Sequence, residues 1–141
     1  MKGFTLVEVL VAMALVAVAG AALAALMEIS GVAIRDARAD TAETFAAQSK
    51  MAELRADPAT FAGGSLSVSV AGYSDFVTSD GLVAGTSAPA PRSAAFLRRW
   101  SVAPATLDPA NTVVLQVVAT RVGRPSAREV HLVSLLAKVA R

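Results

Sequence analysis

The distribution of apolar residues divides the chain into one long N-terminal run and a series of short alternating patterns. Residues 4–27 contain no lysine, arginine or aspartate, and their only acid is Glu8. A helix of this length measures about 36 Å, which is enough to span the hydrocarbon core of a bilayer. The pattern therefore predicts a membrane-spanning helix, in which the Glu8 carboxylate is costly unless it finds a partner.

The helical pattern continues beyond Met27. Residues 28–57 contain no proline, and Gly20 and Gly31 each cost a helix only about 1 kcal/mol relative to alanine. Helical spacing predicts an apolar face made of Ala47, Met51 and Leu54, with Phe45 and Ala52 beside them. The predicted polar face carries Arg35, Asp36, Arg38, Asp40, Glu43, Lys50, Glu53 and Arg55. We expect one helix of about 54 residues that ends before Pro58.

The rest of the chain has the patterns of strands and polar connections. Alternation of apolar and polar residues predicts strands at four places: Ser65–Val70, Phe96–Val102, Thr112–Arg121 and Arg128–Leu136. In the second of these, Arg98 interrupts the predicted apolar face. A hairpin loop at residues 122–126 is expected to join the last two strands.

Residues 71–93 are rich in glycine, serine, proline and aspartate, which predicts that this segment is mainly a loop. Three apolar residues are expected to hold part of it against the core: Tyr73, Phe76 and Val77.

Together these patterns predict an α+β fold, with a small antiparallel sheet packed on the second half of the helix. The expected organisation is a leader at residues 1–3, an apolar half-helix at 4–27, an amphipathic half-helix at 28–57, and a β-rich head at 58–141 that folds with 28–57. At 141 residues, the chain leaves room for only one small core beside its helix. The net charge of +2 predicts no strong attraction to polyanions, and the absence of cysteine excludes disulfides and thiol chemistry.

The reactive side chains in the sequence favour a protein without enzymatic activity. His131 is the only histidine, and alternation places it with Glu129 on one strand face, as an exposed or hydrogen-bonded residue. No second histidine or cysteine completes a zinc site, and neither a G-x-S-x-G motif nor a phosphate-binding glycine pattern is present. Asp75, Asp80 and Asp108 match no compact calcium loop and are expected to be turn residues. We therefore expect no cofactor and no bound metal.

The N-terminus carries the most specific motif. The run Gly3-Phe4-Thr5-Leu6-Val7-Glu8 resembles the class III signal of the type IV pilin superfamily, which includes the pseudopilins of type II secretion. The resemblance implies that a prepilin peptidase cuts between Gly3 and Phe4, and that Phe4 is then N-methylated. The cut frees an amine on Phe4, and in a filament the Glu8 carboxylate of one subunit can pair with the Phe4 amine of a neighbour, which compensates both charges.

The resemblance also implies partners and a location. The partners are other pilin or pseudopilin subunits, the prepilin peptidase and an inner-membrane assembly platform. The chain would be a single-pass protein of the bacterial inner membrane with its head in the periplasm or otherwise outside the cytoplasm, and it would then assemble into a pseudopilus or pilus.

Looser resemblances favour a minor subunit. Residues 45–55 are similar to the helix segment of minor pseudopilin I and of PilV-type minor pilins, and residues 96–102 and 132–136 are similar to their C-terminal half. These similarities leave open whether the filament belongs to a type II secretion system or to a type IV pilus.

A basic bias in the second half of the chain raises the question of nucleic-acid binding. The arginines concerned are Arg92, Arg98, Arg99, Arg121, Arg124 and Arg128, with one aromatic residue, Trp100, among them. Because no groove or row of stacking aromatic residues accompanies them, the pattern favours a solvated sheet face or a docking surface for a neighbouring subunit. No nucleic acid is expected as a partner.

A different class also stays open, namely a signal-anchored or exported envelope binding protein. In a plain anchor, Glu8 lies close enough to the start of the helix to reach the headgroup layer. Ala22-Leu23-Ala24 offers an ordinary signal-peptidase site that would leave a soluble head starting near Ala25. The Gly3-Phe4 junction argues against this class, because a simple membrane anchor does not require these residues at fixed positions before the apolar run.

Overall fold

The computed structural model describes residues 5–57, 62–86, 88–123 and 129–137, and it contains two compact units, Met1–Arg38 and Ala39–Arg141. Several positions singled out in the sequence lie outside the described residues: Gly3, Phe4, Pro58, Arg124, Arg128 and part of the predicted hairpin loop at 122–126.

One helix, α1, runs from Leu6 to Ala56 and contains 51 residues. It is continuous through Gly20 and Gly31, and it ends one residue before the predicted limit. The prediction of a single long N-terminal helix is therefore confirmed. Within the described residues, α1 is the one helix that is long and apolar enough to cross a membrane, judged by length and composition.

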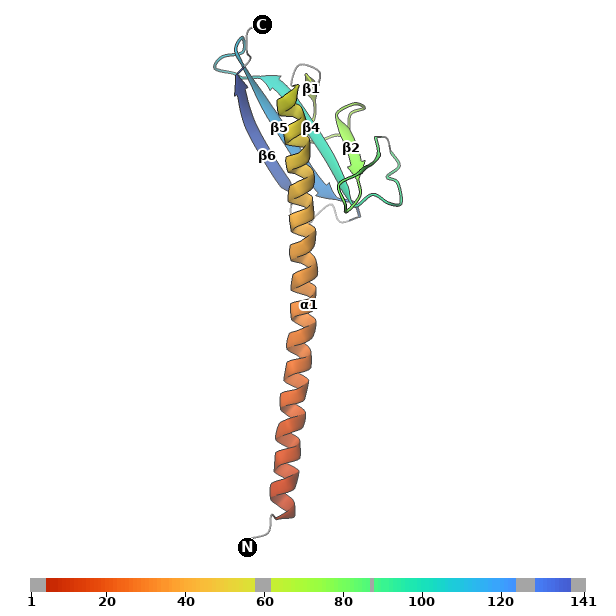
Figure 1. Ribbon diagram of the computed structural model, residues 1–141, viewed down its shortest axis with the longest axis vertical. Helices are drawn as coiled ribbons and strands as arrows, with labels where there is room; N and C mark the ends of the chain where they lie inside the picture. Colours follow the sequence, from red (N-terminus) through yellow and green to blue (C-terminus); the bar gives the residue numbers. More distant parts are fainter. Residues whose placement is uncertain (1–4, 58–61, 87, 124–128, 138–141) are drawn as a thin grey trace. The chain divides into compact units, whose positions relative to one another are not determined.

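The second unit contains a six-stranded antiparallel sheet (Figure 1). Its strands are β1 (Gly63–Gly64), β2 (Ser74–Val77), β3 (Val83–Gly85), β4 (Phe96–Pro104), β5 (Thr112–Arg121) and β6 (Val130–Ala137). Their order is β3-β2-β4-β5-β6, and β1 pairs with β4 beside β2. The long strands β4, β5 and β6 confirm the predicted C-terminal strands, and their alternating side chains give the sheet two distinct faces.

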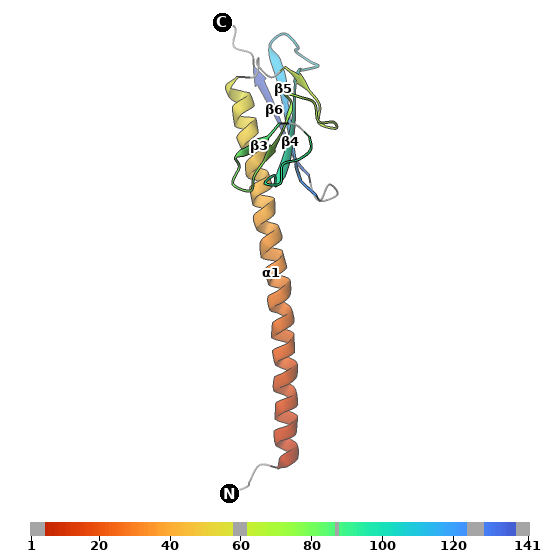
Figure 2. The same cartoon turned by 90° about the vertical axis from the view of Figure 1, so that its right-hand side faces the viewer.

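The core of this unit lies between one face of the sheet and the last turns of α1 (Figure 2). The buried residues of its main cluster are Ala47, Met51, Leu54, Trp100, Val102, Val113, Leu115, Val117 and Ala119. A second cluster is formed by Ala46, Val77 and Phe96. This packing confirms the predicted α+β arrangement, in which the sheet is laid across the second half of the helix.

The buried face of α1 differs from the predicted one at five positions, one of which is the buried Ala46. Phe45 is 61% exposed and Ala52 is also exposed, whereas Glu43 and Lys50 are buried. The buried residues Glu43, Ala46, Ala47, Lys50, Met51 and Leu54 follow the three- and four-residue spacing of one helix face. Phe45 stands two residues before Ala47, or about 200° away around the helix, so its apolar character does not place it on this face.

The strand predicted at Ser65–Val70 is absent, because these residues form bends and irregular structure. The preceding glycines form β1 instead. Along the edge of β4 that faces away from β5, β1 pairs with Val102 and Ser101, and β2 pairs with residues 96–99. Together β1 and β2 line this edge of β4, which leaves no place there for residues 65–70.

The prediction that residues 71–93 are mainly a loop is confirmed, but it missed two short strands in this segment. This segment contains β2 and β3, which pair with each other around a turn at Asp80-Gly81. The expectation that apolar residues hold it to the core is confirmed, since Phe76 and Val77 are buried and Tyr73 packs against the main cluster.

Candidate functional site

The start of α1 is fixed by a side-chain cap. Thr5 precedes the first helical residue, and its Oγ1 accepts a hydrogen bond from the Glu8 backbone N–H at 3.3 Å. The Thr5 carbonyl also accepts from the N–H groups of Glu8 and Val9. Thr5 and Glu8 therefore hold the two key positions of a capping box, Ncap and N3, and a threonine at Ncap stabilises a helix by about 1 kcal/mol. Glu8 thus lies in the first turn, where its carboxylate also interacts favourably with the helix dipole.

The Glu8 side chain stands at the margin of an apolar surface. Together with Val9, Ala12, Met13, Val16 and Ala17, it lines a shallow groove along α1. Glu8 supplies the only charge in that groove. A cation brought there by another molecule would meet one carboxylate in apolar surroundings, where an ion pair is screened less than in water.

The rest of the first unit presents apolar side chains in all directions. The exposed ones among the described residues include Leu6, Val7, Val9, Leu10, Val11, Met13, Leu15, Val16, Val18, Leu23, Leu26, Met27, Ile29, Val32 and Ile34. The most apolar window of α1 has none of its residues buried within the structure. A continuous apolar surface of this kind marks contact with a membrane or with other proteins.

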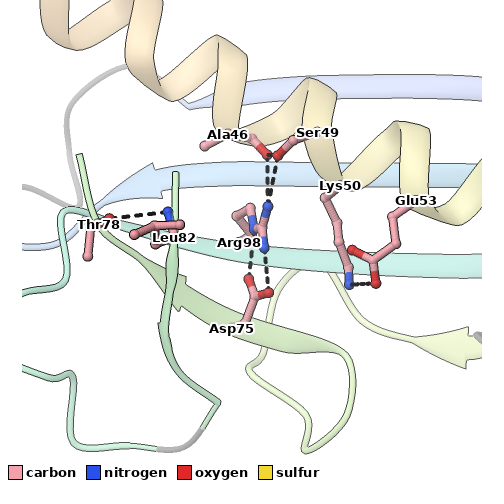
Figure 3. A network of polar contacts seen from close by, with 8 residues as sticks. All are labelled: Ala46, Ser49, Lys50, Glu53, Asp75, Thr78, Leu82 and Arg98. Atoms are coloured by element: carbon pink, nitrogen blue, oxygen red, sulfur yellow. Dashed lines mark hydrogen bonds and ion pairs between the residues drawn. The ribbon is translucent and has the colours of Figure 1, made fainter. Parts of the chain in front are cut away.

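The second unit connects α1 to the sheet through a buried ion pair (Figure 3). Arg98 of β4 lies directly opposite Asp75 of β2, and its Nε and Nη2 donate to the two carboxylate oxygens of Asp75 at 2.8 and 2.6 Å. Its Nη1 donates to the Ala46 carbonyl and to Ser49 Oγ of α1, at 3.2 and 3.0 Å. One guanidinium therefore connects the helix with two strands in a position that excludes water.

A second charged group lies between α1 and β5. Arg121 donates to Glu43 Oε2 at 3.2 Å and also to Asp40 Oδ1. Burial raises the pKa of the Glu43 carboxyl above its ordinary value, although the hydrogen bond and charge of Arg121 oppose that shift. The other carboxylate oxygen, Oε1, is buried without a hydrogen-bond partner in the described part of the chain.

Lys50 completes the set of charges under the sheet. Its Nζ lies 3.8 Å from the centre of the Trp100 ring and 2.9 Å from Glu53 Oε1. A lysine on the buried face of α1 therefore lies between an aromatic face and a carboxylate, both of which attract a cation.

The residues examined for catalysis do not come together. His131 is exposed on β6, and its Nε2 lies 3.0 Å from Glu129 Oε2, which agrees with the predicted hydrogen-bonded strand residue. Asp75 is a buried strand residue rather than the predicted turn residue, because Arg98 neutralises it. Asp108 does lie in a turn, where it accepts from the backbone N–H of Asn111. Within the described ranges, no cluster of histidine, cysteine, aspartate or glutamate could hold a metal ion.

Three arginines of the second half of the chain bind groups within the head rather than forming the predicted solvated face. Arg98 is buried, and Arg121 is paired with two acids of α1. Arg99 donates to the Ser67 carbonyl, and its Nη2 lies 3.9 Å from Glu129 Oε1. These contacts engage three of the six arginines. Arg92 is exposed, and the other two arginines lie outside the described residues, so for them the solvated or docking face stays a prediction.

Sequence reasoning missed two features of these sites. The capping box has a readable signal, since Thr5 and Glu8 stand three residues apart immediately before an apolar run. The Arg98–Asp75 pair has a weaker one, because the arginine interrupts the apolar face of a strand, but its partner lies 23 residues away.

Residues 1–24 match the family model described as the prokaryotic N-terminal methylation motif. The chain therefore carries the class III prepilin signal of type IV pilins and pseudopilins at its N-terminus. No curated protein and no solved structure matches the chain.

Proposed function

We propose that this chain, which begins with a class III prepilin signal, is a non-enzymatic structural subunit of a filament. The filament is a type II secretion pseudopilus or a type IV pilus, and the chain is a minor subunit of its assembly or tip complex. The prepilin peptidase removes residues 1–3, and the mature chain begins with N-methylated Phe4.

The observation that carries this proposal is the position of Glu8. It lies in the first turn of a helix whose following 19 residues, 9–27, contain no charge, and its carboxylate borders an apolar groove. An isolated carboxylate at such a place is costly unless a cation reaches it. The free amine that cleavage creates on Phe4 of a neighbouring subunit supplies that cation.

The proposed mechanism transfers the apolar half of α1 from the membrane into the filament. Before assembly, the apolar half of α1 is anchored in the inner membrane, and the head lies outside the cytoplasm. During assembly, the platform moves the subunit into the filament, where contacts with neighbouring helices replace the contacts with lipid. The Phe4 amine and the Glu8 carboxylate then fix the position of one subunit against the next.

The mature N-terminus tests the processing step. Mass spectrometry of the protein purified from its own membranes should find a chain that starts at N-methyl-Phe4. A start near Ala25 would indicate export by signal peptidase, and a retained Met1 would indicate a simple anchor. Either of these results would contradict the proposed function.

The assembly step is tested with Glu8→Ala. We expect the variant to insert in the membrane and to be processed, but to enter sheared filaments or cross-linked assemblies at a level at least about tenfold lower, because the buried Phe4 amine of the neighbouring subunit loses its partner. Glu28→Gln is the matched control, since Glu28 is an exposed acid of the same helix just beyond the apolar run. Normal assembly of the Glu8→Ala variant would refute the pairing.

A further inference from the structure

The strand β6 forms one edge of the sheet (Figure 1). Its eight residues pair with β5 on one side, and no described strand pairs with them on the other. β6 contains no proline, glycine, lysine or other fixed charge. Soluble proteins usually protect edge strands with such residues, because an open edge is a template for pairing with another chain.

The side chains of β6 are apolar on both faces. Val133 and Leu135 are 66% and 68% exposed on the outer face. Val130, Leu132 and Leu136 point toward the core and pack against its main cluster, although they are only partly buried. Apolar side chains of the core therefore remain partly exposed at this edge of the sheet.

A groove accompanies this open edge. It has a volume of about 400 Å³ and is lined by Gln48, Met51, Ala52 and Arg55 of α1 together with Leu132 and Val133 of β6. A strand added beside β6 would place every second side chain in this groove, since successive side chains of a strand point to opposite faces.

Arg55 gives the groove a positive charge. Its Nε and Nη2 donate to Ser134 Oγ at 3.2 and 2.9 Å, which holds the guanidinium beside β6. The acceptor is a neutral hydroxyl, and among the described residues no acid forms an ion pair with Arg55. An acidic side chain on an incoming strand would complement that charge.

We propose that the open edge of β6 and this groove bind an extended segment of a different subunit by strand addition. The segment alternates in polarity, places apolar side chains in the groove, and carries one acidic residue opposite Arg55. The proposal rests on the proposed function only for the source of the strand, which is another subunit of the same assembly.

A second copy of this chain fits the edge less well. If two β6 strands paired with each other, each would bring its own Arg55 close to the shared edge, because Arg55 is bound to Ser134 in the middle of the strand. Two like charges would then face each other across a small distance, which is unfavourable. The charge of the groove therefore selects a partner that is not identical.

The test uses the full chain in detergent and three fluorescent eight-residue peptides. The first has valine side chains and one glutamate on one face, and threonine on the other. The second replaces the glutamate with lysine, and the third is the first peptide with alternate backbone amides methylated, so that it cannot pair with a strand. Fluorescence anisotropy measures the dissociation constants.

We expect the glutamate peptide to bind at least about threefold more tightly than the lysine peptide, and the methylated peptide not to bind. Arg55→Glu should reverse the preference between the two charged peptides. Val133→Lys should weaken both, whereas Leu107→Lys, at a fully exposed position elsewhere in the head, should change neither. The far-UV circular dichroism spectrum and the Trp100 emission verify that each variant is folded.

Three results would overturn the proposal: equal binding of the methylated peptide, an unchanged preference in Arg55→Glu, or no saturable binding. Sedimentation of the full chain as a dimer that Val133→Lys dissociates would identify a second copy as the occupant, against the proposal. None of these measurements involves Phe4 or Glu8, so the strand-addition site and the processed N-terminus can fail independently.

Discussion

The Arg98–Asp75 pair provides the sharpest test of how the head is held together. Both side chains are about 95% buried, and Arg98 makes four hydrogen bonds that join β4 to β2 and to α1. Replacing Arg98 with methionine keeps much of its length but leaves the Asp75 carboxylate buried without a cation. The free energy of unfolding should fall by about 3–5 kcal/mol, the usual cost of breaking a buried ion pair.

The neutral variant Asp75→Asn separates the charge from the packing. Alone, it leaves the Arg98 guanidinium with neutral acceptors only, namely the new amide oxygen and the two acceptors of α1, so a loss of similar size is expected. In the double variant Arg98→Met/Asp75→Asn neither of the two positions carries a charge, and the residual cost is that of an unsatisfied amide, about 1–3 kcal/mol, plus altered packing. The losses of unfolding free energy in the two single variants, added together, should therefore exceed the loss in the double variant by at least about 2 kcal/mol.

Urea unfolding of the full chain in detergent, followed by the emission of Trp100, measures these differences. Trp100 is the only tryptophan, is buried, and stands two residues from Arg98 in β4. Glu129→Gln, which removes a partly exposed partner of His131, is the control and should cost about 0–1 kcal/mol. If the double variant loses as much stability as the two single variants added together, the two side chains are not energetically coupled and the reasoning is refuted.

Two further predictions concern the head. Gly64→Ala should lower the free energy of unfolding in urea by well over 2 kcal/mol, since Gly64 has φ +95° and an added Cβ would lie 2.2 Å from the Trp100 carbonyl oxygen. Gly123→Ala, at φ +82° in open space, should lower it by only about 1 kcal/mol. Equal losses in the two variants would contradict the steric argument. Glu43→Gln should gain stability relative to the parent as the pH rises above about 4.3. The reason is that the pKa of Glu43 is raised in the folded state, so the parent loses stability between the pKa of the unfolded chain and that of the folded chain. A stability difference that does not depend on pH would show that the pKa of Glu43 is not raised.

The long helix could be predicted because its signals are local. An uninterrupted apolar run, the absence of proline through residue 57 and a helical repeat at Ala47, Met51 and Leu54 each constrain neighbouring residues along the chain. The same holds for β5, whose bounds agree with the predicted strand Thr112–Arg121. Such elements follow from periodicity because their hydrogen bonds or alternating faces repeat at a fixed interval.

The errors arose where a residue's role depends on a distant partner. Ser65–Val70 alternates like a strand, but β1 and β2 already occupy the edge of β4 beside which it would have to lie. Their charge predicted that Glu43 and Lys50 lie on the polar face of the helix. Arg121 on β5 and the Trp100 ring on β4 allow both to be buried. Neither partner is close in sequence, so no local pattern contains this information.

By itself, the sequence determined the N-terminal signal, the apolar half of the helix and the position of Glu8, because each is defined by residue order within a few turns. The tertiary structure decided which charges are buried under the sheet, which strands pair, and that β6 is left with an open edge beside Arg55. The physical reason is that covalent neighbours set a helix and its cap, whereas the burial of a charge and the pairing of a strand require groups that only folding brings together.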